Sequence, residues 1–443
     1  MNILLISYDN GSHIPFFPIN LFYLVGHLKR AGHRVGVWNQ DIHHGPDEAL
    51  LHILNQNEWD VVGLGMVAGY YQYRKMKSLS RVINASTRRP YFQYVLGGHG
   101  PAAEPEWFMR KMGATTVVVG DGEDGFDQIM QGRQGIIHAA PCNNDVAPME
   151  AYEDFYVGIY DLIRWPTSTS TDRCMPILTS RGCKWACSFC YRMRPSYHMR
   201  AVDAIMDEIK YLHNSAGINH FQFADELLMA SEARTEDICQ AISELNFRIK
   251  WDCNGRLNYA KRPVLKLMKT CGCEYINYGI ESLSQELLNQ MKKGLTVNQI
   301  HQGVRETLEA GISPGLNFIW GFPGDTVQNL NDMVEFLLEY DPCHELRTIR
   351  PVTPYPGTAL YRQAIDDGLL EGPEDFYEQK HLNSDLLTVN FMDIPTADAH
   401  KELYHANFKL CENYEIKKTQ KRAGAMYDLY IKGNTSFRGF RPV

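Results

Sequence analysis

Three cysteines stand close together near the middle of this 443-residue chain: Cys183, Cys187 and Cys190. Their spacing, C-x3-C-x2-C, brings three thiolates within reach of one metal centre, and such thiolates hold iron–sulfur clusters. Three cysteines satisfy three corners of a [4Fe–4S] cluster and leave the fourth iron open, as an incomplete ligand set does in a catalytic metal site. The alternative is a structural zinc site, which needs a fourth ligand such as Cys174 or His198. No second C-x2-C pair is present, so the spacing favours the cluster.

The composition excludes several classes of protein. The net charge is −8, 44% of the residues are hydrophobic and 22% are charged, as in a globular protein with room for two or three domains. No basic run stands out, so we expect no nucleic-acid partner. The first residues are typical of a strand rather than a signal peptide, and no apolar run is long enough for a membrane span. Eleven cysteines without an export signal indicate a reducing cytoplasm. An oxygen-sensitive cluster would suit an anaerobic cell.

Residues 1–140 alternate apolar strand segments with helical segments. This pattern predicts a Rossmann-like, doubly wound parallel sheet. The expected strands are 2–7, 34–39, 60–66, 92–96 and 115–119, and the expected helices are 20–31, 47–56, 72–84 and 104–112. Glycine-rich loops follow three of the strands. Because ligands bind beyond the carboxyl ends of the strands in such sheets, these loops are candidates for a binding site.

A second alternating pattern begins after a polar linker, residues 141–172, and extends over residues 173–385. The expected strands are 175–179, 220–224, 248–253, 275–280, 316–320 and 347–352, with helices such as 201–212, 234–245 and 297–310 between them. Six strands predict a partial, open (β/α)6 barrel of the TIM type, with the cysteines in the loop after its first strand. Residues 386–443 are expected to form a small, mainly helical cap. Its helix, 396–413, either closes the open side of the barrel or packs on the barrel's outside.

The segment 181–191, RGCKWACSFCY, resembles the signature of the radical SAM superfamily. Glycine precedes the first cysteine, and the aromatic Phe189 precedes the third. In that family the open iron binds the amino and carboxylate groups of S-adenosylmethionine (SAM). An electron from the cluster then cleaves SAM to a 5′-deoxyadenosyl radical. The resemblance therefore implies a [4Fe–4S] cluster, SAM, and an external one-electron reductant such as flavodoxin or ferredoxin.

Residues at later strand ends match further motifs of that family. A carboxylate at the end of the second barrel strand accepts from the SAM amino group in relatives. Arg256 resembles the arginine that pairs with the SAM carboxylate, for which its planar guanidinium is suited. The SAM-binding residues implied by the resemblance are Phe189, Asp225, Glu226, Arg256, Glu281, Ser282 and Gly321. Lys292 and Lys293 continue the family pattern, and we expect both to be solvated. Cys271 and Cys273 are expected to be free thiols.

Residues 1–140 resemble the cobalamin-binding domain that precedes many radical SAM domains, through segments 60–66, 96–101 and 119–123. The cobalamin contacts implied are Tyr8, Gly65, Met66, Tyr70, Gly97, Gly98, His99, Gly120, Gly122 and Glu123. The D-x-H-x-x-G motif of methionine synthase and the mutases, which supplies a histidine axial ligand, is not present after the first strand. The alternative is a vestigial sheet that serves only as a lid over the substrate or as a dimer surface.

The resemblance covers residues 1–385 and implies a cobalamin-dependent radical SAM C-methyltransferase. Such an enzyme methylates an unactivated carbon through the 5′-deoxyadenosyl radical and methylcobalamin. One alternative is a non-methylating cyclase or oxidative rearrangement enzyme, similar to the anaerobic magnesium-protoporphyrin ester cyclase. A non-catalytic cobalamin or SAM sensor is the other, and the complete cysteine triad argues against it. The substrates compatible with the family are a tetrapyrrole, an isoprenoid, an antibiotic precursor, or a protein side chain such as one in methyl-coenzyme M reductase.

Overall fold

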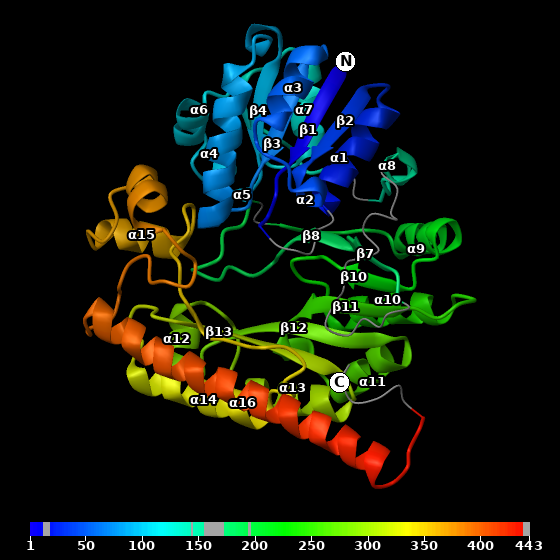
Figure 1. Cartoon of the computed structure of the whole chain (residues 1–443), viewed down its shortest axis with the longest axis vertical. Helices are drawn as coiled ribbons and strands as arrows, with labels where there is room; N and C mark the ends of the chain where they lie inside the picture. The colour runs from blue at the N-terminus through cyan, green and yellow to red at the C-terminus, as the bar shows by residue number, and fades with distance from the viewer. Residues whose placement is uncertain (12–17, 143–144, 155–171, 194–195, 437–443) are drawn as a thin grey trace.

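The computed structural model describes residues 1–11, 18–142, 145–154, 172–193 and 196–436. One sheet with its helices lies above a second sheet, and a long helix crosses the far side of the second sheet (Figure 1). A continuous apolar core extends from one face of the first sheet into the barrel. Most of the predicted linker, residues 141–172, lies outside the described residues. Among the described helices none is long and apolar enough to span a membrane.

The first sheet has six parallel strands in the order β2-β1-β3-β4-β5-β6. They are β1 (Asn2–Ser7), β2 (Arg34–Asn39), β3 (Val61–Gly65), β4 (Gln93–Gly97), β5 (Thr116–Val119) and β6 (Gly135–His138). The helices are α1 (Ile19–Arg30), α2 (Gln40–His43), α3 (Ala49–Gln56), α4 (Tyr70–Ala85), α5 (His99–Ala103), α6 (Pro105–Met112) and α7 (Gly122–Met130). The order of the strands reverses between β1 and β3. This switch point, where doubly wound sheets bind ligands, faces the second sheet.

The second sheet is the predicted partial barrel. Its six parallel strands follow the order β14-β13-β12-β11-β10-β7, without closure between the two edge strands. They are β7 (Cys174–Ile177), β10 (His220–Phe223), β11 (Lys250–Gly255), β12 (Cys273–Glu281), β13 (Ser313–Trp320) and β14 (Arg350–Pro351). The outer helices are α9 (Val202–Ala216), α10 (Glu232–Ser243), α11 (Arg262–Thr270), α12 (Gln285–Gln290), α13 (Val297–Glu309) and α14 (Val327–Tyr340). The sequence therefore predicted the fold class correctly.

A short antiparallel ribbon interrupts the barrel after its first strand. It consists of β8 (Ser180–Gly182) and β9 (Tyr197–Met199), with Arg181 opposite His198. The cysteines lie in the connection between these two strands. We call its described part, residues 183–193, the cysteine loop. The sequence did not predict the ribbon, because three-residue strands carry too little pattern to be distinguished from a loop.

The C-terminal part of the chain divides between the two sheets. Helix α15 (Ala359–Asp366) and the π-helical turn η4 (Asp375–Lys380) join the apolar core of the first domain, where the Tyr377 ring lies 4.7 Å from the Tyr73 ring. The sequence assigned both segments to the barrel, because their apolar side chains did not reveal which core they enter. Helix α16 (Thr396–Tyr430) packs along α14 on the barrel's outside and is longer than the predicted helix.

Candidate active site

The cysteine loop is held against the barrel by backbone hydrogen bonds. The Ser188 amide donates to the Met291 carbonyl at 2.9 Å, and the Leu360 amide donates to the Ser188 carbonyl at 2.9 Å. Cys183 and Cys187 are partly buried, Cys190 is exposed, and none of the three forms a disulfide. Three free thiols on one anchored loop are suited to holding three corners of a [4Fe–4S] cluster.

Two thiols of this loop, Cys183 and Cys190, have a raised pKa. Desolvation around its sulfur raises the pKa of Cys190 to about 12, although the residue as a whole is exposed. Desolvation also raises the pKa of Cys183, despite a hydrogen bond from the Trp185 backbone. Because iron is bound by thiolates, assembly of a cluster on this loop must release protons.

Arg256 lies directly beside the cysteine loop. Its guanidinium carbon is 3.9 Å from the centre of the Trp185 ring, and its Nη1 is 3.9 Å from the Cys187 sulfur. Arg256 also donates to the carbonyl of Lys293 and is only 6% exposed. A buried cation next to the cluster loop can pair with a ligand carboxylate there.

Lys293 is a site residue whose environment the sequence did not predict. We expected a solvated side chain, but Lys293 is 6% exposed and its Nζ lies 2.7 Å from the Glu281 Oε1. The Nζ also lies 5.8 Å from the centre of the Phe189 ring in the cysteine loop. Pairing allows both charges to be buried, because an unpaired carboxylate at Glu281 would be costly to remove from water. Position within the family motif was the only signal that could have suggested Lys293.

Glu281 occupies a strained position at the end of β12. Its φ is +74°, in the left-handed region that residues other than glycine seldom adopt. A break in the pairing of β12 with β13, between Gly279 and Glu281, accompanies this conformation. Such strain persists where the surroundings fix it and is typical of ligand sites. It turns Glu281 toward Lys293. Ser282, the next residue, is fully buried and accepts a hydrogen bond from the Ser284 amide.

The two adjacent acids after β10 differ in role. Asp225 is buried and accepts hydrogen bonds from the Thr179 amide at 2.6 Å, the Thr179 hydroxyl and the Ser180 hydroxyl. Burial raises the Asp225 pKa, while these donors oppose the shift. Asp225 therefore holds the segment that leads into β8. Glu226 is exposed and remains the candidate acceptor for the SAM amino group.

Gly321, which the sequence placed at the adenine of SAM, opens a turn after β13. Its φ is +97°, and its amide donates to the Asp325 carboxylate at 3.0 Å. A Cβ at this position would lie 2.9 Å from the Leu387 side chain. Glycine is thus required here by the conformation of the turn and by the close packing of residues after η4.

The predicted cobalamin loop and the predicted SAM site meet. His99, at the start of α5, places its Nε2 3.9 Å from the Glu226 Oε1. The same ring lies edge-on to Tyr191, the residue after Cys190, with 5.8 Å between ring centres. The carboxyl end of the first sheet therefore faces the cysteine loop across this contact.

The residues around the switch point suit a large flat ligand. A Cβ on Gly97 would find no atom within 4 Å, so the backbone there can be approached closely. Gly98 has a φ of +88°, and a Cβ there would lie 2.3 Å from the Met66 carbonyl oxygen. Tyr8 follows β1, Tyr70 begins α4 and Gly65 ends β3. All three therefore lie at this edge of the sheet.

The third glycine-rich loop has partners inside the protein instead. Gly120 has a φ of +121°, and a Cβ there would lie 2.4 Å from the Ala139 carbonyl oxygen, while one on Gly122 would meet Leu24. The Glu123 carboxylate receives two hydrogen bonds from Arg181. Three of the predicted cobalamin contacts, Gly120, Gly122 and Glu123, thus already have partners within the protein. The sequence gave no sign of the distant partner Arg181.

Comparison with known families supports this reading of the two sheets. Residues 177–337 match the radical SAM superfamily, and residues 14–130 match the B12 binding domain family. An uncharacterized methyltransferase of Pyrococcus horikoshii is 27% identical over 409 residues, which cover 88% of this chain and 83% of that protein. The bacteriochlorophyllide d C-12(1)-methyltransferase of Chlorobaculum tepidum is 25% identical, over 52% of each chain. The anaerobic magnesium-protoporphyrin IX monomethyl ester cyclase of Cereibacter sphaeroides is 28% identical, over 42% of this chain and 31% of that protein.

Two solved structures share the fold over most of the chain. The cobalamin-dependent radical enzyme OxsB, with aqua-cobalamin and SAM bound, has a TM-score of 0.72 at 14% identity, over 98% of this chain and 69% of that one. The methyltransferase TsrM from Kitasatospora setae has a TM-score of 0.69 at 19% identity, over 91% of this chain and 88% of that one. The fold and the three-cysteine loop define a radical SAM enzyme. The chain combines a radical SAM domain with an N-terminal B12-binding domain, as the cobalamin-dependent members of that superfamily do. Its cofactors are a [4Fe–4S] cluster, SAM and cobalamin.

Proposed function

We propose that this enzyme transfers a methyl group to an unactivated carbon atom of its substrate. The observation that carries the proposal is the meeting of His99 with Glu226 and Tyr191. This contact brings the carboxyl end of the first sheet, where we expect cobalamin, against the cysteine loop. One substrate bound between them would reach both the cobalamin and the cluster. The methyltransferases among the similar proteins support the same activity. When bound, the cofactors supply reductive cleavage of SAM and donation of the methyl group.

The chain's own residues bind the cluster and orient SAM. Cys183, Cys187 and Cys190 hold the cluster, and an external reductant such as flavodoxin or ferredoxin supplies the electron. In this proposal Arg256 pairs with the SAM carboxylate, and Glu226 accepts from the SAM amino group. Most of the rate enhancement that a protein can offer here is placement, because a misplacement of 1 Å costs about 100-fold.

The substrate we propose is a small natural product, such as a tetrapyrrole or isoprenoid, or a protein or peptide side chain such as one in methyl-coenzyme M reductase. A non-methylating radical reaction is the second candidate. The likeness to the magnesium-protoporphyrin ester cyclase favours it, although that likeness covers less than half of this chain.

Anaerobic reconstitution with iron, sulfide and hydroxocobalamin tests the proposal. We expect about four irons and about one cobalt per chain after desalting. With SAM labelled in its methyl group and a panel of candidate substrates, the label is expected in the product. Cobalt binding without any methylated product would favour the second candidate, and iron without cobalt would contradict the cobalamin-dependent mechanism.

Cys187→Ala is the variant that tests the role of the cysteine loop. We expect it to lose iron and reductive SAM cleavage together, because a two-cysteine loop holds the cluster poorly. Cys411→Ala, in the partly exposed position on α16, is the matched control and should retain both. SAM cleavage that survives in Cys187→Ala would contradict the assignment of the cluster ligands.

A further inference from the structure

Two arginines bracket the cysteine loop. Arg181 lies in β8, directly before Gly182 and Cys183, and Arg200 follows β9. Since β8 and β9 pair with each other, both stems of the loop are parts of one ribbon. Whatever holds these two arginines therefore also holds the loop.

Arg181 is held by the first domain. Its two terminal nitrogens donate to the two oxygens of Glu123, at 2.6 and 3.1 Å, and Nη1 lies 3.4 Å from the Asp121 carboxylate. The three side chains are between 9% and 15% exposed. A two-pronged, charge-assisted pair fixes orientation as well as distance, and little water is present to weaken it. The pair connects the start of α7 in the first domain to the stem of the cysteine loop.

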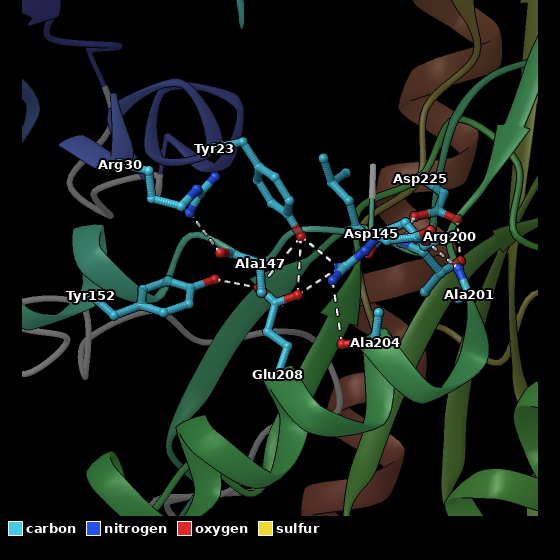
Figure 2. A network of polar contacts seen from close by, with 12 residues as sticks. Tyr23, Arg30, Asp145, Ala147, Tyr152, Arg200, Ala201, Ala204, Glu208 and Asp225 are labelled. Carbon is cyan, nitrogen blue, oxygen red and sulfur yellow. Dashed lines mark hydrogen bonds and ion pairs between the residues drawn. The ribbon is translucent and has the colours of Figure 1, made fainter. Parts of the chain in front are cut away.

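Arg200 is held by a second, fully buried group of residues (Figure 2). It donates to the Glu208 carboxylate at 2.5 Å and to the Tyr23 hydroxyl at 2.6 Å, and that hydroxyl donates to Glu208 at 3.0 Å. The Tyr23 ring, on α1 of the first domain, also lies 5.3 Å from the Arg181 guanidinium carbon and 5.6 Å from that of Arg200. Both stems of the ribbon thus rest on the same domain.

The acidic residues around Arg181 do not need a metal ion to explain them. Ligand atoms of Asp121, Glu123 and Cys142 lie within 4.8 Å of one another, a spacing that a cation could bridge. The Arg181 guanidinium already brings a positive charge to both carboxylates. The pairing therefore accounts for the two acids.

We propose that Arg181, Glu123 and Asp121 are positioning residues, which fix the cysteine loop relative to the cobalamin domain. The inference rests on the proposed methyl transfer, since that reaction needs both cofactors aligned within about 1 Å. Reductive cleavage of SAM needs the cluster and the SAM-binding residues of the barrel, but not the cobalamin domain. Loosening this link should therefore slow the step that joins the two cofactors more than the step that occurs at the cluster.

The test compares Glu123→Gln with Asp121→Asn. Glu309→Gln is the matched control, because it breaks an exposed pair with Arg262. The first readout is hydrogen exchange of residues 180–183 in protein without cofactors. The second compares two rates in reconstituted protein without substrate, methylation of added cob(I)alamin by SAM and formation of 5′-deoxyadenosine.

We expect Glu123→Gln to speed exchange in β8 and to slow cobalamin methylation by about 100-fold, with cobalt content and 5′-deoxyadenosine formation unchanged. Asp121→Asn should have the same effect to a smaller degree, because its contact is longer. Unchanged exchange, or an equal fall of both rates, would overturn the proposal. Loss of cobalt would overturn it by assigning Glu123 to cobalamin binding. If Glu123→Gln does not fold, Asp121→Asn carries both readouts. If the wild type methylates no cobalamin, the proposed function fails, while hydrogen exchange still tests the link.

Discussion

One pair of opposite charges is buried at this site, Lys293 with Glu281. Arg256, also buried, lies close to the Trp185 ring and to the Cys187 sulfur. Removing one member of such a pair leaves the other without a partner, which costs more than the pair itself contributes. The site therefore couples ligand binding to the stability of the barrel.

Lys293→Met shows this coupling most directly. Because Glu281 would remain buried without its partner, we expect a loss of about 3–5 kcal/mol in the free energy of unfolding, measured by urea denaturation of the protein without cofactors. Lys292→Met is the matched control, since Lys292 is the neighbouring residue and is exposed. It should change stability by less than about 0.5 kcal/mol. Equal losses in the two variants would contradict the buried pair.

The sequence predicted the cysteines but not Lys293, for a physical reason. The three cysteines act through their spacing along the chain, which is visible in the sequence. Burial of Lys293 depends on the backbone of Glu281, which turns into the left-handed region at a break in strand pairing. The local sequence does not predict that conformation, because the left-handed region is typical of glycine and this residue is a glutamate.

At the scale of elements, the open edge of the barrel has backbone groups that no neighbouring strand can pair. The edge strand β14 has only two residues, and the sheet does not close around it. The Asn407 amide of α16 both accepts from the Ile349 amide at 2.8 Å and donates to the Ile349 carbonyl at 3.0 Å. One side chain thus replaces a neighbouring strand at this residue, which is 1% exposed.

Asn407→Ala should leave both backbone groups of Ile349 buried without partners. We expect a loss of about 2 kcal/mol in the free energy of unfolding, from equilibrium denaturation in urea. Lys409→Ala, also on α16, breaks only an exposed pair with Glu335 and serves as the control. A loss no larger than that of the control would show that water satisfies the edge.

Element prediction succeeded where patterns were long. The strands and helices of both sheets repeat apolar residues over enough positions to identify them. β6 was missed because its four residues follow a turn and carry only two aliphatic side chains. The second half of α16 was missed because buried residues end at Leu410, so no apolar stripe continues along it.

On the scale of the whole molecule, the two domains share one interior. Tyr23 of the first domain and Tyr152, which precedes the barrel, both donate to Glu208 of the barrel, at 3.0 and 2.7 Å. The sequence could predict each domain, because each has its own pattern. It could not predict how the domains dock, because docking depends on single polar residues far apart in the chain.

Tyr23→Phe tests the shared interior. The substitution keeps the ring but removes a hydroxyl that Arg200 and Glu208 both use. We expect a loss of about 1 kcal/mol in the free energy of unfolding. We also expect the first domain to unfold at a lower temperature than the barrel in calorimetry. Tyr91→Phe is the control, because Tyr91 is 71% exposed. A single transition that matches the control would contradict a stabilising role for this contact.

The contact of η4 with α4 also bears on how the chain is made. Tyr73 donates to the Glu378 carboxylate at 2.7 Å across a separation of 305 residues. The first domain therefore emerges from the ribosome long before the segment that covers α4 has been synthesised. Until residue 378 has been synthesised, the aromatic surface around Tyr73 stays open to other nascent chains. We expect translation products that stop before that residue to aggregate, although their B12-binding sheet is complete.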